Sequence, residues 1–204
     1  MKHLLILSLL LGFFFSFGCD QGSDLTSFEY DSTAQDKVDT YPPGAESVFI
    51  PMNLPPSEIP NLTVSKVIDG QSGGYIEIYF EYDDGPGPGD GPRHNNDIIL
   101  YARLDISPNA FNGSETIWMI IDNEIGSISF YPHIVFNTPV NLDLIYRGID
   151  LEGIIPNSVD FIFQNFDGST EQLTYASIVV DPDEGYLALD DAKLHHFSRY
   201  GWTR

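Results

Sequence analysis

The sequence contains a single cysteine, Cys19, and few basic residues. One thiol can form no internal disulfide, so a disulfide-stapled fold is excluded. Nine lysines and arginines stand against 30 acidic residues, which gives a formal net charge of −21. Such a surface repels phosphate groups, which argues against nucleic acid and against broad contact with anionic lipid headgroups. Helical periodicity is also scarce, since no 3.6-residue repeat persists beyond a turn or two.

Long hydrophobic runs are absent as well, except for one at the N-terminus. It extends from Leu4 to Phe17 behind the basic Lys2. A transmembrane helix needs about 20 apolar residues, so this run is too short to cross a bilayer. A short apolar run behind a positive charge is typical of a secretory signal peptide, which we assign to residues 1–18.

The end of this run resembles the bacterial lipobox, in which a small residue precedes a cysteine that becomes acylated. Gly18 and Cys19 fit that pattern, whereas Ser16 departs from it because leucine is usual three positions before the cysteine. The resemblance implies lipid attachment, for example of palmitate, at Cys19. It therefore implies a membrane-anchored protein of the bacterial cell envelope that faces outside the cytoplasm. A free cysteine beside an ordinary cleavage site is the alternative.

The residues that follow predict a tether and then one domain. Residues 20–45 contain six acidic residues and one lysine, with many Gly, Ser, Thr and Pro residues and no apolar period. Such a composition cannot bury enough surface to offset chain entropy, so we expect residues 19–45 to be a lipidated cysteine and a disordered acidic tether. Residues 46–204 have the length of a single domain that can bury a sizeable core.

Strand-like alternation dominates this domain. In residues 75–82 the two sides are Ile76, Ile78, Phe80 and Tyr82 against Tyr75, Glu77, Tyr79 and Glu81. The other strand-like segments are residues 98–106, with Tyr101, Arg103 and Asp105 outward, and residues 116–121, 140–147, 159–166, 173–180 and 186–189. Residues 116–121 are apolar on both faces, as expected for a covered central strand. About nine or ten short strands separated by turn signals predict an all-β fold, an antiparallel β-sandwich.

Part of this pattern is similar to the ZU5 domain. The matching residues are Gly73 and Gly74 before a strand, then Pro108, Ala110 and Phe111, then Pro132, Phe136, Pro139 and Leu142. The resemblance covers about residues 62–150, and the insertion at residues 83–97 departs from it. ZU5 domains are β-sandwiches that mediate protein contacts and have no catalytic residues. The resemblance therefore implies a structural or interaction role without a cofactor.

Several residues are candidates for chemistry, each with a plainer interpretation. Ser72 in the sequence GQSGG fits the nucleophile-elbow pattern, although a β-pattern follows it where an elbow needs a helix. Oxygen ligands for calcium occur in the loop 83–97, at Asp83, Asp84, Asp90, Asn95, Asn96 and Asp97, and in a later turn, at Asp181, Asp183 and Glu184. Solvated acidic loops are the plainer interpretation. The histidines of the mature chain, His94, His133, His195 and His196, show no zinc-site spacing, so no metal site is assigned.

The last ten residues, HHFSRYGWTR, predict one closing strand. Leu194, His196, Ser198, Tyr200 and Trp202 would share the core-facing side, and Lys193, His195, Phe197, Arg199 and Thr203 the other. Arg199 would then lie against a carboxylate. The functional rival is an exposed pair of Tyr200 and Trp202 that stacks on a sugar ring.

The sequence thus predicts an envelope lipoprotein whose β-sandwich binds a protein partner or has a structural role, without enzymatic activity. The first alternative is a carbohydrate-binding module assisted by calcium. The second is an envelope hydrolase, which would need Ser72 beside a histidine or two carboxylates at catalytic spacing.

Overall fold

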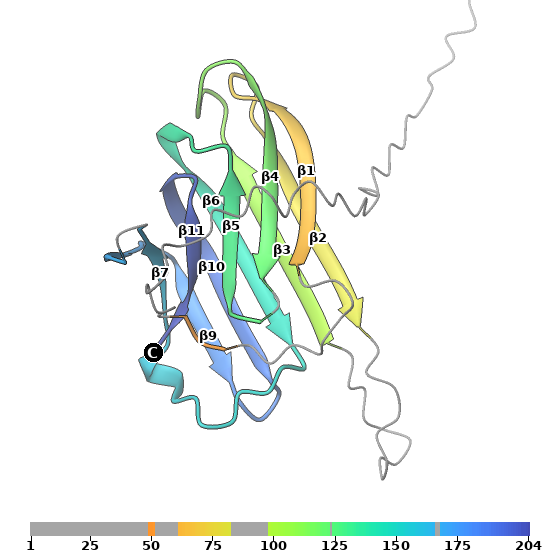
Figure 1. Cartoon of the computed structure of the whole chain (residues 1–204), viewed down its shortest axis with the longest axis vertical. Coiled ribbons are helices and arrows are strands. Elements are labelled where there is room, and N and C mark those ends of the chain that lie inside the picture. Colours follow the sequence, from red (N-terminus) through yellow and green to blue (C-terminus); the bar gives the residue numbers. More distant parts are fainter. Residues whose placement is uncertain (1–48, 52–60, 83–97, 123, 166–167) are drawn as a thin grey trace, which may run out of the picture.

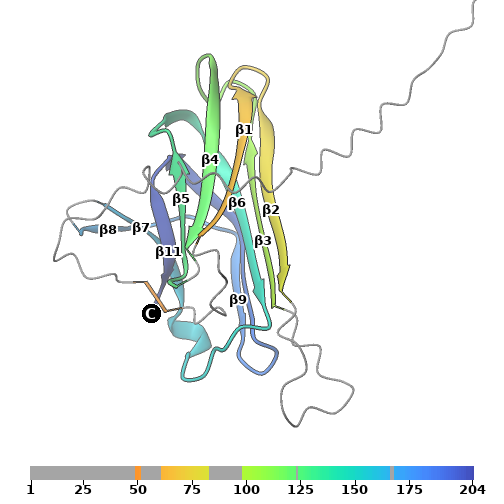
Figure 2. The ribbon, with the colours of Figure 1, turned by 45° about the vertical axis from the view of Figure 1, so that its right-hand side comes forward.

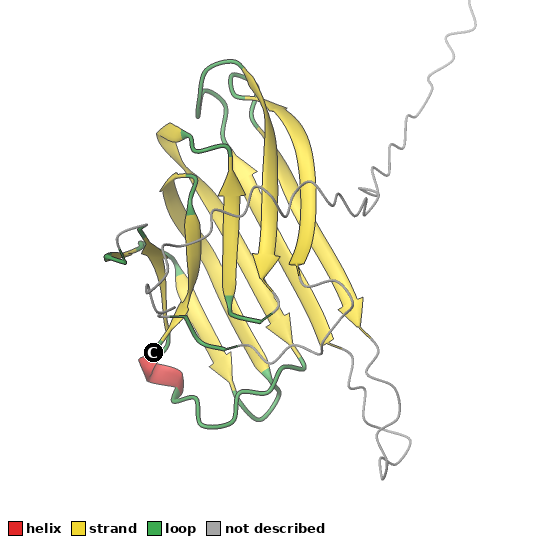
Figure 3. Ribbon diagram, viewed as in Figure 1, coloured by secondary structure: helices red, strands yellow, loops and turns green. Residues whose placement is uncertain are grey.

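The computed structural model describes residues 49–51, 61–82, 98–122, 124–165 and 168–204. They form strands joined by turns, together with one short 3-10 turn, η2 (Pro156–Ser158) (Figures 1 and 3). The strands are β1 (Asn61–Asp69), β2 (Gly74–Tyr82), β3 (Ile98–Ile106), β4 (Ser114–Asp122), β5 (Ser127–Tyr131), β6 (Val135–Arg147), β7 (Asp160–Gln164), β8 (Thr170–Gln172), β9 (Ser177–Asp181), β10 (Tyr186–His196) and β11 (Arg199–Thr203). Within these described ranges, no helix has the length and apolar character needed to span a membrane.

The strands make two antiparallel sheets that pack against each other (Figure 2). One sheet has six strands in the order β1-β4-β5-β11-β7-β8, and the other has five in the order β2-β3-β6-β10-β9. The predicted all-β sandwich is therefore confirmed. β1 and β2 follow each other in the chain but belong to different sheets, so the turn between them joins the two layers at one side.

Alternation decides which side of each strand enters the core. Ile76 and Ile78 of β2 are buried, whereas Tyr75 and Tyr79 on either side of them are 40% and 50% exposed. β3 shows the same pattern, with its even-numbered residues from 100 to 106 buried. Full burial of one such aliphatic side chain contributes about 1.5–3 kcal/mol relative to exposure. The predicted alternation is thus confirmed at these positions, and Phe80 and Ile98 are partly buried against the same core.

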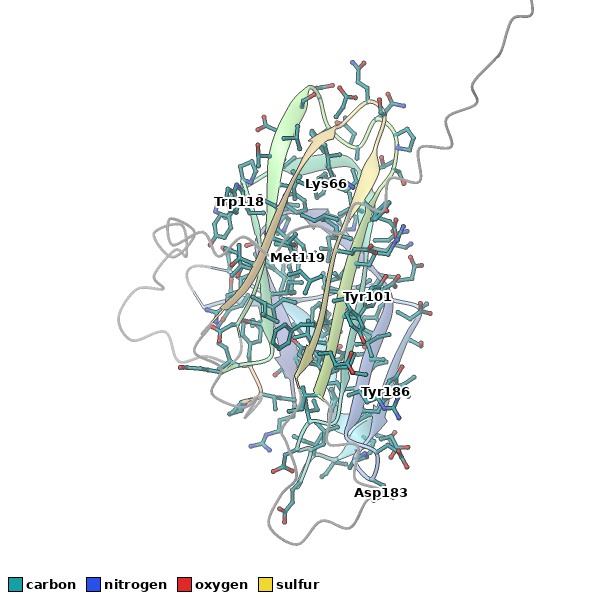
Figure 4. All side chains as sticks on the ribbon, turned by 90° about the vertical axis from the view of Figure 1, so that its right-hand side faces the viewer. Lys66, Tyr101, Trp118, Met119, Asp183 and Tyr186 are labelled. Carbon is teal, nitrogen blue, oxygen red and sulfur yellow. The ribbon has the colours of Figure 1, made fainter. Side chains whose placement is uncertain are left out.

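β4 is the covered interior strand that its sequence predicts. It lies between β1 and β5 in the six-stranded sheet. Met119 is buried on its inner side, and Ile120 is buried on its outer side. Figure 4 shows the neighbouring Trp118 and Met119 on opposite sides of the strand.

The C-terminal residues correct the prediction of a single closing strand. β10 ends at His196 in the five-stranded sheet, and β11 begins at Arg199 in the six-stranded sheet. Leu194, Tyr200 and Trp202 face the core as predicted, but between these two strands the chain crosses from one layer to the other, a distance of about 10 Å. Phe197, which a single strand would place outside, is consequently buried against the rings of Phe130 and Phe136, at centroid distances of 5.2 and 4.7 Å.

The strand predicted at residues 173–180 is divided in a similar way. β8 ends before it in the six-stranded sheet, and β9 forms only its second half in the five-stranded sheet. Between them the N–H of Ala176 donates to the carbonyl of Asp190 at 2.9 Å. Tyr175 packs against the core, and its hydroxyl donates to the Asp160 carboxylate at 2.8 Å. This crossing closes the sandwich on the side away from β1 and β2.

β1 is a strand that the sequence analysis does not assign, because Lys66 interrupts its apolar alternation. The Lys66 ammonium lies 4.4 Å from the ring centroid of Tyr75 on β2, and the Arg103 guanidinium carbon lies 4.0 Å from the same centroid. A lysine stem can lie along apolar surface while its charged head reaches the edge. The Lys66 contact links the neighbouring edges of the two sheets, whereas the Arg103 contact lies within the five-stranded sheet.

Residues that carry the ZU5 resemblance close one end of the sandwich. Ala110 and Phe111 are buried in the turn between β3 and β4, and the Phe111 ring lies 6.3 Å from that of Phe136. Gly73 has a φ of +71°, and a Cβ there would lie 2.4 Å from the carbonyl oxygen of Ile106. Only glycine meets both demands, so these positions have a packing role.

The first described residues are attached to the last strand. The N–H of Ile50 donates to the Trp202 carbonyl at 2.8 Å, and the N–H of Gly126 donates to the Ile50 carbonyl at 2.9 Å. A Cβ on Gly201 would lie 2.6 Å from the Phe49 ring. Because Gly201 alternates with the inward Trp202, Phe49 packs on the outer face of the six-stranded sheet.

Candidate functional site

Ser72 does not form a nucleophile elbow. It lies in the turn between β1 and β2, where its N–H donates to the Asp69 carboxylate at 2.8 Å. Hydrogen bonds from Ser72 lower the pKa of Asp69. β2 begins directly at Gly74, so no helix follows to supply the N–H groups of an oxyanion site. The elbow hypothesis is therefore wrong, and the residues form a glycine-rich turn.

The acidic turn at residues 181–185 is organised by its own backbone. One carboxylate oxygen of Asp181 accepts the N–H groups of Asp183 at 3.1 Å and Glu184 at 3.2 Å. Across the part of the chain that the structure describes, no group of three or more His, Cys, Asp or Glu side chains could hold a metal ion. The loop 83–97 with its candidate calcium ligands and His94 lies outside the described residues, as do Cys19 and the rest of residues 1–48.

The three described histidines are distributed over separate contacts. His133 Nδ1 lies 3.2 Å from the Phe197 carbonyl oxygen, and the His196 ring packs edge-on to Phe163 at 4.7 Å. His195 is exposed on β10. The two adjacent histidines point to opposite sides of the strand, as the sequence predicts.

The alternative of an exposed sugar-stacking pair at Tyr200 and Trp202 is wrong, and the core-facing side predicted for both residues is confirmed. Both side chains face the core, at 1% and 0% exposure. The Tyr200 hydroxyl donates to the carbonyl of His196. On the opposite side of β11, Arg199 Nη2 lies 3.8 Å from the Asp122 carboxylate, as the sequence predicts for this arginine.

A different set of aromatic side chains reaches solvent on the outer face of the five-stranded sheet. We call this surface the tyrosine face, after Tyr75, Tyr79, Tyr101 and Tyr186. Figure 4 shows Tyr101 and Tyr186 on the side of the sandwich opposite Trp118. The tyrosine face is therefore separated from the outer face of the six-stranded sheet by the whole core.

The centre of the tyrosine face is an apolar row that crosses all five strands. Cross-strand pairing brings five residues into this row, in the order Tyr79, Tyr101, Ile145, Ala188 and Val179. Neighbouring strands lie 4.7–4.9 Å apart, so the row is about 19 Å long. Tyr79 and Val179 at its two ends are 50% and 49% exposed. Burial followed by the charge of Glu77 raises the pKa of Tyr101, which stays neutral at physiological pH.

Charged side chains flank the apolar row. The carboxylates are Glu77, Glu81, Asp105, Asp143, Asp181, Asp190 and Asp191, and the cations on the strands of this sheet are Arg103, Arg147 and Lys193. Seven formal negative charges against three positive charges, or four with Lys66 of β1 beside Tyr75, leave this surface net negative. A bulge in β10 contributes to this excess by bringing two aspartates together, the second with a φ of +55°.

Two of the three cations are bound within the face. Arg103 donates to Asp105 through two nitrogens, at 2.8 and 2.9 Å, and lies 3.3 Å from Glu77. Hydrogen bonds to the Asp105 carboxylate raise the pKa of Arg103, which keeps its charge. Lys193 lies 2.7 Å from the carboxylate of Asp191. Arg103 and Lys193 therefore neutralise neighbouring carboxylates of the same face.

The outer face of the six-stranded sheet is different. Phe49 covers the sheet at β11, with the Arg199 guanidinium carbon 5.3 Å from its ring centroid. Arg199 Nε donates to the buried hydroxyl of Ser127 at 3.2 Å. The chain itself therefore occupies part of this face.

Sequence alternation already places Tyr75, Tyr79 and Tyr101 outward, but it does not bring them together. The row depends on the register between β2 and β3 and on the position of β9 at the far edge of the sheet. The repeated pattern Tyr-x-Glu-x-Tyr-x-Glu in β2 is the signal that could have selected this face. No protein-family model matches the sequence, and no match is found among curated proteins or solved structures.

Proposed function

We propose that this protein is a lipid-anchored binding module of the bacterial cell envelope, and that its tyrosine face binds a protein partner. The observation that carries the proposal is the apolar row from Tyr79 to Val179 with charged side chains on both sides. Tyrosine is enriched among the residues that dominate binding energy, and a polar rim excludes water around them. The ZU5 resemblance, which implies protein contacts, supports the same role.

The size of the tyrosine face suggests a moderate affinity. The row spans about 19 Å, and the seven residues from Tyr75 to Glu81 rise about 20 Å along β2. The resulting area of roughly 400 Å² is about half of what one partner contributes to a standard interface of about 800 Å² per side. An anchor on Cys19 would compensate by holding the module near other envelope proteins at high effective concentration.

Binding is tested by photo-crosslinking and pull-down from native membranes with matched variants. Val179 and Val67 are both exposed valines on edge strands, but Val67 lies on β1 of the other sheet. We expect Tyr79→Ser to lower partner capture about tenfold and Val179→Ser to lower it less, because a buried tyrosine contact exceeds about 1.4 kcal/mol. Val67→Ser should leave capture unchanged.

Equal capture by all three variants would contradict the proposed face. Glycan binding that disappears in Tyr79→Ser would instead support the carbohydrate-binding alternative over a protein partner. We propose no enzymatic activity, because the Ser72 arrangement that a serine hydrolase needs is absent from the turn that contains it.

The lipid anchor has a separate test. Cys19→Ala should abolish metabolic labelling with palmitate and release the protein from membranes, because one acylated thiol supplies the attachment. Unchanged labelling would refute the anchor while leaving the tyrosine face untouched.

A further inference from the structure

We infer that the partner binds the tyrosine face through a basic segment in extended conformation that lies along β2, an inference that rests on the proposed function. Aromatic and acidic side chains alternate on the outer side of this edge strand, in the order Tyr75, Glu77, Tyr79 and Glu81. Residues two apart on one side of a strand are separated by about 6.6–6.8 Å. A second extended chain has the same repeat, so a lysine or arginine at every second position would match the series.

The charge of the face selects a cationic occupant. Its seven carboxylates outnumber its cations, three on the sheet and Lys66 beside Tyr75, and Arg103 and Lys193 already contact carboxylates of the same face. An anionic ligand would therefore meet an excess of negative charge and no uncommitted pair of donors. A second copy of this chain would bring the same excess of negative charge, in a protein whose formal charge is −21. A basic segment gains Coulomb energy at the same surface.

One tyrosine ring of this face, that of Tyr75, already accepts cations from within the molecule. Lys66 and Arg103 lie 4.4 and 4.0 Å from the centroid of Tyr75. At the next tyrosine of β2, four residues further along, the Tyr79 hydroxyl donates to Glu81 at 3.0 Å, which holds a carboxylate beside the ring. Tyr79 is half exposed, so a cation of the partner can approach its ring and meet the Glu81 carboxylate at the same time.

The test uses the full-length protein and three defined probes. They are a fluorescent peptide alternating lysine and threonine, the same peptide with glutamate in place of lysine, and a neutral β-linked glucan oligosaccharide. Binding is measured by fluorescence anisotropy for the peptides and by calorimetry for the oligosaccharide. We expect only the lysine peptide to bind, with an affinity that falls as ionic strength rises because the contacts are exposed.

The key variant is the pair of isosteric substitutions Glu77→Gln and Glu81→Gln. Arg103 keeps its two hydrogen bonds to Asp105 in this variant, so the sheet is expected to remain folded. Asp183→Asn with Glu184→Gln removes the same number of charges from the distant turn between β9 and β10. We expect about a tenfold loss of affinity in the first pair and less than about a twofold loss in the second.

Equal losses in the two pairs would overturn the inference, because binding would then follow total charge and not the tyrosine face. Absence of binding by the lysine peptide, or binding of the oligosaccharide alone, would also overturn it. If membrane capture still depended on Tyr79 in either case, the proposed function would stand with a different ligand. If neither peptide binding nor capture depended on Tyr79, both would fail.

Discussion

Replacement of Tyr146 by phenylalanine should stabilise the protein. Tyr146 lies on β6 with a fully buried side chain, and its hydroxyl has no hydrogen-bond partner among the described residues. Tyr146→Phe removes this one oxygen and leaves the ring in its packing. A buried hydroxyl without a partner costs about 1–3 kcal/mol. We therefore expect a gain of about 1–2 kcal/mol in the free energy of unfolding and a Tm higher by roughly 2–8 °C.

The same substitution should change the response to alkaline pH. Burial, followed by the nearby charge of Asp122, raises the pKa of Tyr146 above its ordinary value of 10.0. Above that pH the unfolded chain loses a proton that the folded chain keeps, so stability falls as pH rises. Tyr146→Phe removes this contribution, and its advantage over the wild type should widen above pH 10.

Thermal and urea unfolding measure both effects, and Tyr200→Phe is the matched control. The Tyr200 hydroxyl donates to the His196 carbonyl on the facing side of the core. Its removal should cost about 1 kcal/mol, because a buried carbonyl loses its partner. The same chemical change should thus have opposite signs at the two positions. A loss of stability in Tyr146→Phe comparable with that in Tyr200→Phe would refute the reasoning.

Two further predictions concern a turn and a second tyrosine. Gly73→Ala should destabilise the protein about 1–3 kcal/mol more than Gly113→Ala in urea unfolding. Both residues have a positive φ, but only at Gly73 would a Cβ meet the Ile106 carbonyl. Equal losses of stability would show that the backbone conformation alone matters. Burial and the hydrogen bond to Asp160 raise the pKa of Tyr175 to about 12. The contribution of Tyr175 to stability is therefore complete below pH 10 and disappears towards pH 12. The free energy of unfolding of Tyr175→Phe should fall less steeply than that of the wild type between these pH values. Tyrosinate absorbance should show one fewer group that titrates late.

Much of the fold follows from local sequence, because apolar residues at every second position indicate which side of a strand is buried. Ile76 and Ile78 enter the core and Tyr79 does not, as the alternation predicts. The presence of two layers follows from the same pattern, since many half-apolar strands must cover one another's apolar sides.

The crossings between the layers were less predictable. Residues 173–180 and the last ten residues are β-prone throughout, so each reads as one strand. The break is decided by distant partners: Tyr200 pairs with Ile128 and Phe163 in one sheet, while Leu194 pairs with Val140 in the other. No local sequence pattern specifies these pairings. Phe197, which lies between the two strands, therefore turns into the core.

The candidate site shows the same division between local and long-range information. Alternation predicts that Tyr79 and Tyr101 point to the same side of the sheet. Whether an aromatic side chain on that side is buried or exposed depends on which face of the sheet the other layer covers. Trp202 illustrates the difficulty, because its sequence allows both a core-facing and a sugar-stacking role, and the structure buries it completely. The tyrosine face exists only through the register of five strands, which no single segment specifies.

The position where the chain enters the domain favours the tyrosine face as the binding surface. Phe49, the first described residue, packs over Gly201 on the outer face of the six-stranded sheet. The tyrosine face lies on the other sheet, beyond a core whose two layers are about 10 Å apart. The described part of the chain thus begins on the side of the core away from the tyrosine face. A partner can then bind there without displacing Phe49, whereas a partner on the six-stranded sheet would first have to remove a buried ring from its place.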